Sequence, residues 1–124
     1  MYETYTLSNG LRVIAEPIRH FRSVSVGLWV GAGVITERPE ENGLSHFLEH
    51  MLFKGTQSRT AREIAEAMDS IGGQINAFTS KECTCYYAKV MDEHLPVAMD
   101  VLCDLLQNAA LDPAELEKER GVIL

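Results

Sequence analysis

The sequence has no long apolar run, few basic residues and few cysteines, and each shortage excludes a class of protein. A membrane-spanning helix needs about 20 consecutive apolar residues, and the 124-residue chain does not contain such a run. With 11 Lys and Arg against 18 Asp and Glu, the formal charge is −7, and no basic patch is present. Binding to a nucleic-acid backbone depends on such patches, so we expect neither a nucleic acid nor a membrane as partner.

The three cysteines are an odd number without the spacing of a disulfide framework, which favours a reducing compartment. Cys83 and Cys85 would lie on one face of a strand, as a metal-binding pair would. No second cysteine pair or nearby histidine completes that site. We therefore expect all three cysteines, Cys103 included, to act as small apolar residues.

The rest of the sequence has the composition of a globular domain, with 46% hydrophobic and 23% charged residues. Alternating apolar residues predict strands, and the turn dipeptide Asn9-Gly10 separates the first two. Apolar stripes predict helices. A capping box from Thr60 to Glu63 and Asp112 as an N-cap indicate where two of these helices begin. The expected strands are 3–8, 11–17, 23–30, 74–79 and 84–91, and the expected helices are 44–54, 60–71, 95–108 and from 113 onward. The fold class is α+β, a mainly antiparallel sheet packed against helices, with Trp29 in its core.

The stretch His46-Phe47-Leu48-Glu49-His50 carries the clearest chemical signal. On a helix, residues i and i+4 lie on one face, so the two imidazoles can converge on one metal ion. Glu49 falls on the flank of that face, where a carboxylate can accept a proton from a metal-activated water. The residues expected to anchor the opposite side in the core are Phe47, Leu48, Met51 and Leu52. The alternative is a helix with two surface histidines and a solvated glutamate.

The residues around this helix resemble the pitrilysin-type zinc metallopeptidases, whose signature is H-x-x-E-H. They are most similar to the β-type branch of mitochondrial processing peptidases and its bacterial relatives. The similarity continues through 7–13, 29–33, 43–56, 72–80, 86–88 and 116–120. It implies a zinc endopeptidase that hydrolyses extended polypeptides with metal-activated water. It also implies that residues 1–124 are the N-terminal part of a peptidase domain, cut within its last helix.

The resemblance assigns roles to single residues. His46 and His50 would be zinc ligands, and Glu49 would be the general base. A third ligand, a glutamate, is expected near position 126, beyond Leu124. Glu119 matches a further acidic position of the family and would support the site. The alternative places Glu119 on a solvated helix face with the glutamates at 115 and 117, and for those two we prefer it.

The strand 74–79 has two interpretations. By its pattern it is an ordinary strand with Ile75 and Ala77 facing inward. The resemblance implies instead an exposed edge that pairs with an extended substrate through main-chain hydrogen bonds. Asn76, Ala77 and Phe78 are the residues expected to contact that substrate. His20 and His94 have no ligand-like neighbours in the sequence and are expected at the surface.

Two functional hypotheses follow. The first is a zinc endopeptidase that acts with a second peptidase-like half or an identical subunit. The second is a non-catalytic partner subunit or scaffold, or a piece that folds but lacks the third ligand and activity. The intact set of His46, Glu49 and His50 favours the first. The first ten residues show no secretory signal, which favours a bacterial cytoplasmic protein or a mature mitochondrial one.

Overall fold

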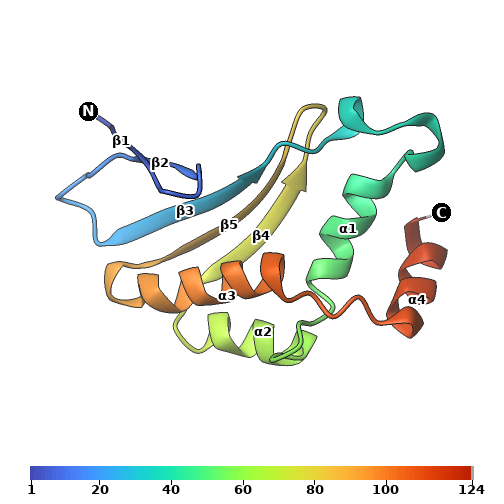
Figure 1. Cartoon of the computed structure of the whole chain (residues 1–124). Coiled ribbons are helices and arrows are strands. Elements are labelled where there is room, and N and C mark those ends of the chain that lie inside the picture. Colours follow the sequence, from blue (N-terminus) through green and yellow to red (C-terminus); the bar gives the residue numbers. More distant parts are fainter. Residues whose placement is uncertain (124) are drawn as a thin grey trace.

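The computed structural model describes the backbone of residues 1–123 and the side chains of residues 1–121 (Figure 1). The predicted α+β class is confirmed. The strands are β1 (Glu3–Thr6), β2 (Arg12–Ala15), β3 (Ser23–Val30), β4 (Gln74–Thr79) and β5 (Thr84–Met91). The helices are α1 (Leu44–Leu52), α2 (Ala61–Asp69), α3 (Leu95–Gln107) and α4 (Pro113–Ile123). Short 3-10 turns lie at Val34–Thr36, Pro39–Glu41 and Asp92–His94.

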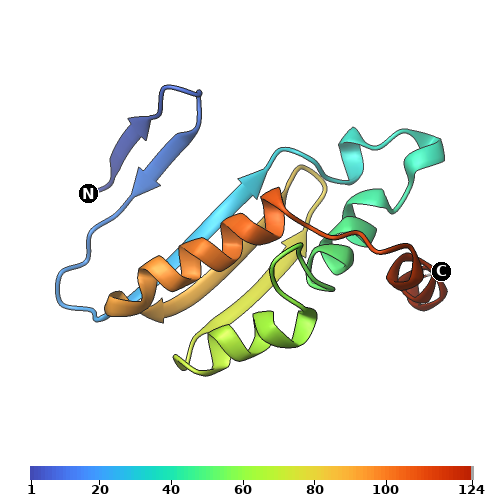
Figure 2. The same ribbon diagram turned by 60° about the horizontal axis from the view of Figure 1, so that its bottom comes forward.

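The strands form two separate antiparallel sheets (Figure 2). β1 and β2 make a hairpin through the predicted turn, where Gly10 has a φ of +91° and donates its amide to the Leu7 carbonyl at 2.9 Å. The larger sheet has the order β3-β5-β4, so within residues 1–123 strand β4 pairs only with β5. Its unpaired edge faces the side of the molecule that carries α1.

The core lies between one face of this sheet and the helices α2 and α3 (Figures 1 and 2). It consists of apolar side chains that are at least nine-tenths buried: Leu52, Ile64, Met68, Tyr86, Ala88, Val90, Ala98, Val101, Leu102 and Leu105. The helix α1 buries Met51 and Leu52 as expected, but Leu48 is 36% exposed and does not anchor the helix. No helix within residues 1–123 is long and apolar enough to cross a membrane.

The prediction for Trp29 is wrong, because its side chain is 67% exposed. The alternation in β3 sends Val26 and Leu28 toward the helices, so Trp29 lies on the opposite face of the sheet. There it meets Phe78 of β4 edge to face, with 5.7 Å between the ring centroids. Of the cysteines, which are all free thiols, Cys85 is buried, whereas Cys83 and Cys103 are half-buried.

The buried Tyr86 makes the fold sensitive to alkaline pH. Burial raises the pKa of its hydroxyl to about 12, and the charge of Glu49 contributes. Because this value lies above the ordinary 10.0, the stabilisation from neutral Tyr86 is complete below pH 10 and is lost as the pH rises through 12. We expect the difference in phenolate absorbance between the wild type and Tyr86→Phe to titrate near pH 12. A difference that titrates near pH 10 contradicts the burial of this hydroxyl.

Candidate metal centre and active site

The helix α1 begins at a glycine with a left-handed conformation and is capped by a carboxylate from the preceding loop. Gly43, at the N-cap, has a φ of +88°, which other residues adopt only with strain. The Glu37 side chain accepts the amides of Gly43 at 3.4 Å and Ser45 at 3.2 Å. A negative group at this end of a helix also suits the helix dipole. Glu37 therefore fixes the start of the helix that carries the H-x-x-E-H residues.

The two histidines of α1 point their Nε2 atoms toward each other. The distance between His46 Nε2 and His50 Nε2 is 3.1 Å. His50 Nδ1 lies 3.1 Å from Glu119 Oε2 of α4, so the ring can donate its Nδ1 proton to that carboxylate. This tautomer leaves Nε2 of His50 unprotonated and available to a metal, as in many metal-bound histidines.

This donor pair fits a zinc ion. Two nitrogens bound to tetrahedral zinc at about 2.0–2.1 Å lie roughly 3.3 Å apart, which is close to the 3.1 Å between the two Nε2 atoms. His46 is exposed and His50 is half-buried, so both are accessible to an ion from solution. Within the part of the chain that the structure describes, no group of three His, Cys, Asp or Glu residues forms a metal site. The glutamate expected near position 126 lies outside the described residues.

Glu119 is buried beside this pair and does not lie on a solvated helix face. It is 6% exposed, while Glu117 is exposed and Glu115 is half-buried. Its Oε1 is 2.8 Å from Lys54 Nζ, and its Oε2 is the partner of His50. The Lys54 ammonium and, less strongly, the contact with His50 hold the pKa of Glu119 below its usual range. Since both oxygens are engaged, Glu119 is placed to orient His50.

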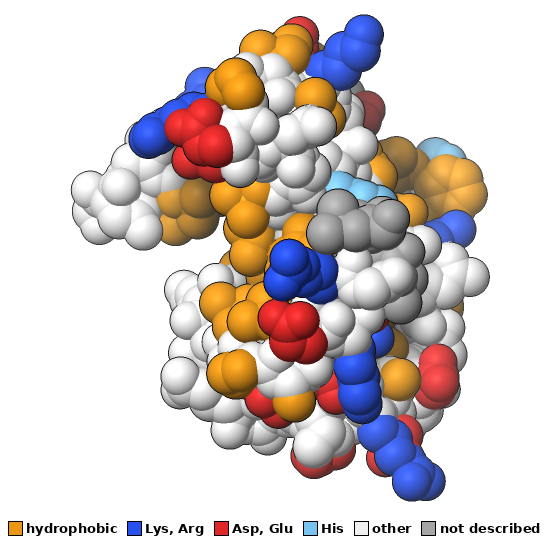
Figure 3. Space-filling view, turned by 90° about the vertical axis from the view of Figure 1, so that its right-hand side faces the viewer, with side chains coloured by type: hydrophobic (Ala, Val, Ile, Leu, Met, Phe, Trp, Pro, Cys, Tyr) orange, Lys and Arg blue, Asp and Glu red, His pale blue; other side chains and the backbone are white. Residues whose placement is uncertain are grey.

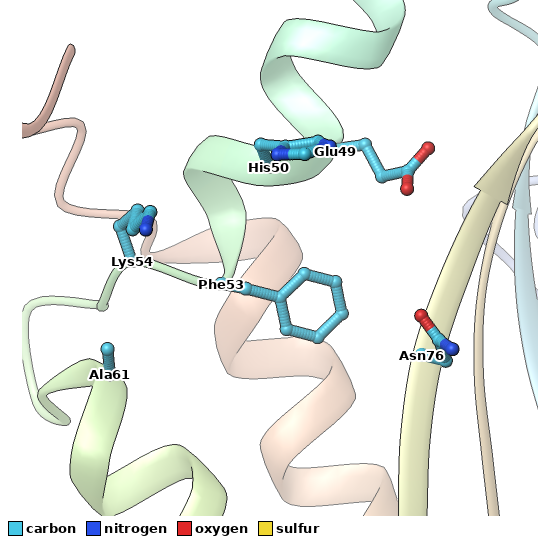
Figure 4. Close-up of a pocket in the computed structure, with 6 residues that line it drawn as sticks. All are labelled: Glu49, His50, Phe53, Lys54, Ala61 and Asn76. Carbon is cyan, nitrogen blue, oxygen red and sulfur yellow. The ribbon is translucent and has the colours of Figure 1, made fainter. Parts of the chain in front are cut away.

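The Glu49 side chain points toward strand β4 (Figure 4). Its carboxylate accepts a hydrogen bond from the Thr79 hydroxyl at the end of that strand. A recess of about 300 Å³ between α1 and β4 is lined by Glu49, His50, Phe53, Lys54, Ala61 and Asn76. In the surface view, histidine side chains reach the face that carries α4, near a hollow with hydrophobic walls (Figure 3). Sequence reasoning missed Thr79, although strand alternation placed it on the face of Ile75 and Ala77.

The three residues expected to contact substrate are not gathered at one point. Asn76 lines the recess with Glu49 and accepts the amide of Ala77 through its side-chain oxygen at 2.8 Å. Ala77 packs against the core. Phe78 is 40% exposed and contacts Trp29 and Tyr87, at centroid distances of 5.7 and 6.0 Å. All three belong to β4, and only Asn76 shares the recess with Glu49 and His50.

The other two histidines lie away from this site. His20 is exposed and its ring lies 4.7 Å from that of Phe21, between centroids. His94 is half-buried, and its Nε2 atom is 3.6 Å from a carboxylate oxygen of Glu93. Neither joins a second histidine, so both serve as controls for metal binding.

Comparisons with known proteins identify a family and several relatives of this chain. The family described as "Insulinase (Peptidase family M16)" matches residues 12–124. The "uncharacterized zinc protease YmxG" of Bacillus subtilis is 56% identical over 123 residues, which are 99% of this chain and 30% of that protein. The "probable mitochondrial-processing peptidase subunit beta" of Arabidopsis thaliana is 50% identical over 119 residues, 96% of this chain and 22% of that protein.

Among solved structures, a protease from Helicobacter pylori superimposes with a TM-score of 0.93 and 29% sequence identity. The match covers 99% of this chain and 30% of that one. The chain thus spans less than a third of the length of these relatives.

Proposed function

We propose that this chain, which belongs to peptidase family M16, carries the metal-binding and proton-accepting part of a zinc endopeptidase. The observation that carries the proposal is the convergence of His46 Nε2 and His50 Nε2 at 3.1 Å, with Glu49 beside them on the same helix. The names of the similar proteins, zinc proteases and a processing peptidase subunit, support it. Residues 1–124 would then form the N-terminal part of a peptidase domain.

Each side chain of the site has a defined task in peptide hydrolysis. His46 and His50 would hold zinc, which supplies Lewis-acid chemistry and makes water a nucleophile near neutral pH. Glu49 accepts a proton from the attacking water and delivers it to the leaving amine. Thr79 orients Glu49, and Glu119 keeps His50 in the tautomer that presents Nε2. The ligand expected near position 126 would complete the site.

Strand β4 supports an extended polypeptide as the proposed substrate. Within residues 1–123 this strand has one unpaired edge, next to the recess that Glu49 and Asn76 line. An extended polypeptide would add to that edge through main-chain hydrogen bonds, with Asn76, Ala77 and Phe78 along its path. Such binding accepts many sequences and leaves specificity to side-chain pockets.

The partner and the location are part of the same proposal. One relative is named as a subunit, so we propose a second peptidase-like half or an identical subunit as partner. The organisms of the relatives suggest the bacterial cytoplasm or the mitochondrion. The second candidate function is a non-catalytic scaffold or a piece that folds without activity.

Chelation tests the proposed activity on the complete protein. We expect purified protein to hydrolyse an unstructured peptide, to lose that activity when zinc is removed by a chelator, and to regain it with one equivalent of zinc. Hydrolysis that persists in the metal-free protein contradicts the proposal. A zinc-loaded protein that hydrolyses no peptide, alone or with its partner subunit, supports the scaffold instead.

Thr79 gives a sharper test of how Glu49 is oriented. Thr79→Val removes the donated hydroxyl and keeps the side-chain volume. A hydrogen bond to a charged group contributes about 1.5–3 kcal/mol, so we expect kcat for peptide hydrolysis to fall by about tenfold or more. KM and zinc content should change little, and Thr79→Ser should recover most of the rate. A Thr79→Val enzyme with unchanged kcat contradicts this role.

A further inference from the structure

Two segments far apart in the chain are joined next to the metal centre. We call them the α1–α4 junction: residues 55–60, which follow α1, and residues 108–110, which precede α4. Thr56 and Ala109 form an antiparallel bridge. The Gln57 amide donates to the Asn108 carbonyl at 2.9 Å, and Ala110 donates to Gly55 at 3.0 Å. The junction therefore connects the helix that carries His50 with the helix that carries Glu119.

A buried carboxylate from α3 holds both segments of the junction. Asp104 is 7% exposed. It accepts hydrogen bonds from Thr56 Oγ1 at 2.6 Å, Ser58 Oγ at 3.2 Å, Arg59 Nη1 at 2.9 Å and Asn108 Nδ2 at 3.0 Å. The Thr56 hydroxyl and the other donors lower the pKa of Asp104 to about 2, so the group is charged at neutral pH. Its acceptor capacity is used within the junction.

We propose that Asp104 is a positioning residue for the metal centre, acting by fixing the two segments of the α1–α4 junction to each other. This inference rests on the proposed zinc-peptidase function. By fixing the junction, Asp104 determines how α4 lies against α1. In this position Glu119 Oε2 is 3.1 Å from His50 Nδ1. Lys54, between α1 and the junction, also contacts the Glu119 carboxylate, with its Nζ 2.8 Å from Oε1. Loosening the junction lets Glu119 move from both partners and leaves His50 without its orienting acceptor.

Asp104→Asn in the complete protein tests the proposal, because the amide keeps the side-chain volume and loses the charge. Partners that orient metal-bound histidines typically contribute a factor of about 10–100 in metal affinity. We therefore expect zinc affinity, measured by competition with a chelator, to fall by that factor. We also expect kcat to fall while KM stays near the wild-type value. In hydrogen exchange, the amides of Gln57, Ala110 and α4 should exchange faster, while those of β5 do not change.

The matched control is Asp100→Asn. Asp100 binds the other side of the Arg59 guanidinium, at 2.5 Å, and its side chain is 69% exposed. This variant should match the wild type in zinc affinity and in exchange at the junction. If Asp104→Asn does not fold, Thr56→Val against Thr56→Ser carries the same test, since only the serine keeps the donor to Asp104.

Three results overturn the inference. The first is a zinc affinity equal to that of the wild type, and the second is unchanged exchange at the junction. The third is faster exchange throughout the protein, β5 included, because Asp104 would then act on general stability. A wild-type protein that binds no zinc contradicts the proposed function instead, and local exchange at the junction still reports whether Asp104 fixes α4 against α1.

Discussion

Glu49→Gln is expected to lower kcat/KM for peptide hydrolysis by about 10²–10⁴-fold, the range that a general base contributes. The amide keeps the shape of Glu49 and still accepts the hydrogen bond from Thr79, but it cannot take a proton from the attacking water. At about 1.4 kcal/mol per factor of ten, the loss corresponds to roughly 3–6 kcal/mol of transition-state stabilisation. Zinc content and KM should stay close to the wild-type values, because Glu49 is not a proposed ligand.

The control for this variant is Glu117→Gln on α4. Glu117 is exposed and pairs only loosely with Arg120, at 3.7 Å, so its neutralisation should leave hydrolysis unchanged. A Glu49→Gln enzyme that hydrolyses peptide at the wild-type rate contradicts the proposed role of Glu49. If Glu49→Gln loses zinc as well as activity, Glu49 belongs to the metal-binding set and a different group must accept the proton.

Removal of either histidine of α1 has the second large expected effect. His46→Ala and His50→Ala should each reduce bound zinc from about one equivalent to nearly none at micromolar free zinc, with loss of hydrolysis. The reason is that catalytic zinc is held by three protein ligands, so the loss of one leaves an incomplete set. Bound zinc is measured by atomic absorption after equilibration with a zinc buffer.

His94→Ala and His20→Ala are the matched controls, since neither histidine lies beside a second histidine: His20 contacts Phe21 and His94 contacts Glu93. Both should retain zinc and activity. The two site variants should also differ in structure. His50→Ala deprives Glu119 of one of its two partners and leaves Lys54 alone on that buried carboxylate, whereas His46→Ala leaves the contact at 3.1 Å with His50 in place. Zinc binding by either site variant at wild-type affinity contradicts the assignment.

The sheet was predictable because its strands carry strong alternation and are bounded by turn residues. The predicted strands 23–30, 74–79 and 84–91 coincide with β3, β4 and β5. Trp29 shows the limit of such patterns. Alternation tells which residues share a face, but the placement of helices decides which face is buried. Helix α1 ends at Leu52, two residues before the predicted end, because the Phe53 and Lys54 amides close a tighter last turn with His50 and Met51.

The site was predictable only where its members are close in the sequence. Spacing alone placed His46, Glu49 and His50 on one helix surface. The contact of His50 with Glu119 joins residues 69 positions apart, and that of Glu49 with Thr79 joins residues 30 apart. Local patterns do not specify such pairs, and only the resemblance indicated a role for Glu119. Glu37 was overlooked as a cap because it reaches α1 from a loop six residues before Gly43.

Diffraction at the zinc absorption edge, from crystals of the complete zinc-loaded protein, tests directly whether His46 and His50 hold the metal. We expect one strong anomalous peak between His46 and His50, with both Nε2 atoms at about 2.0–2.1 Å from the metal. His50 Nδ1 should remain within hydrogen-bond distance of Glu119, as it is here at 3.1 Å. A zinc ion bound elsewhere in a protein that hydrolyses peptides, with the two histidines unliganded, would contradict this assignment.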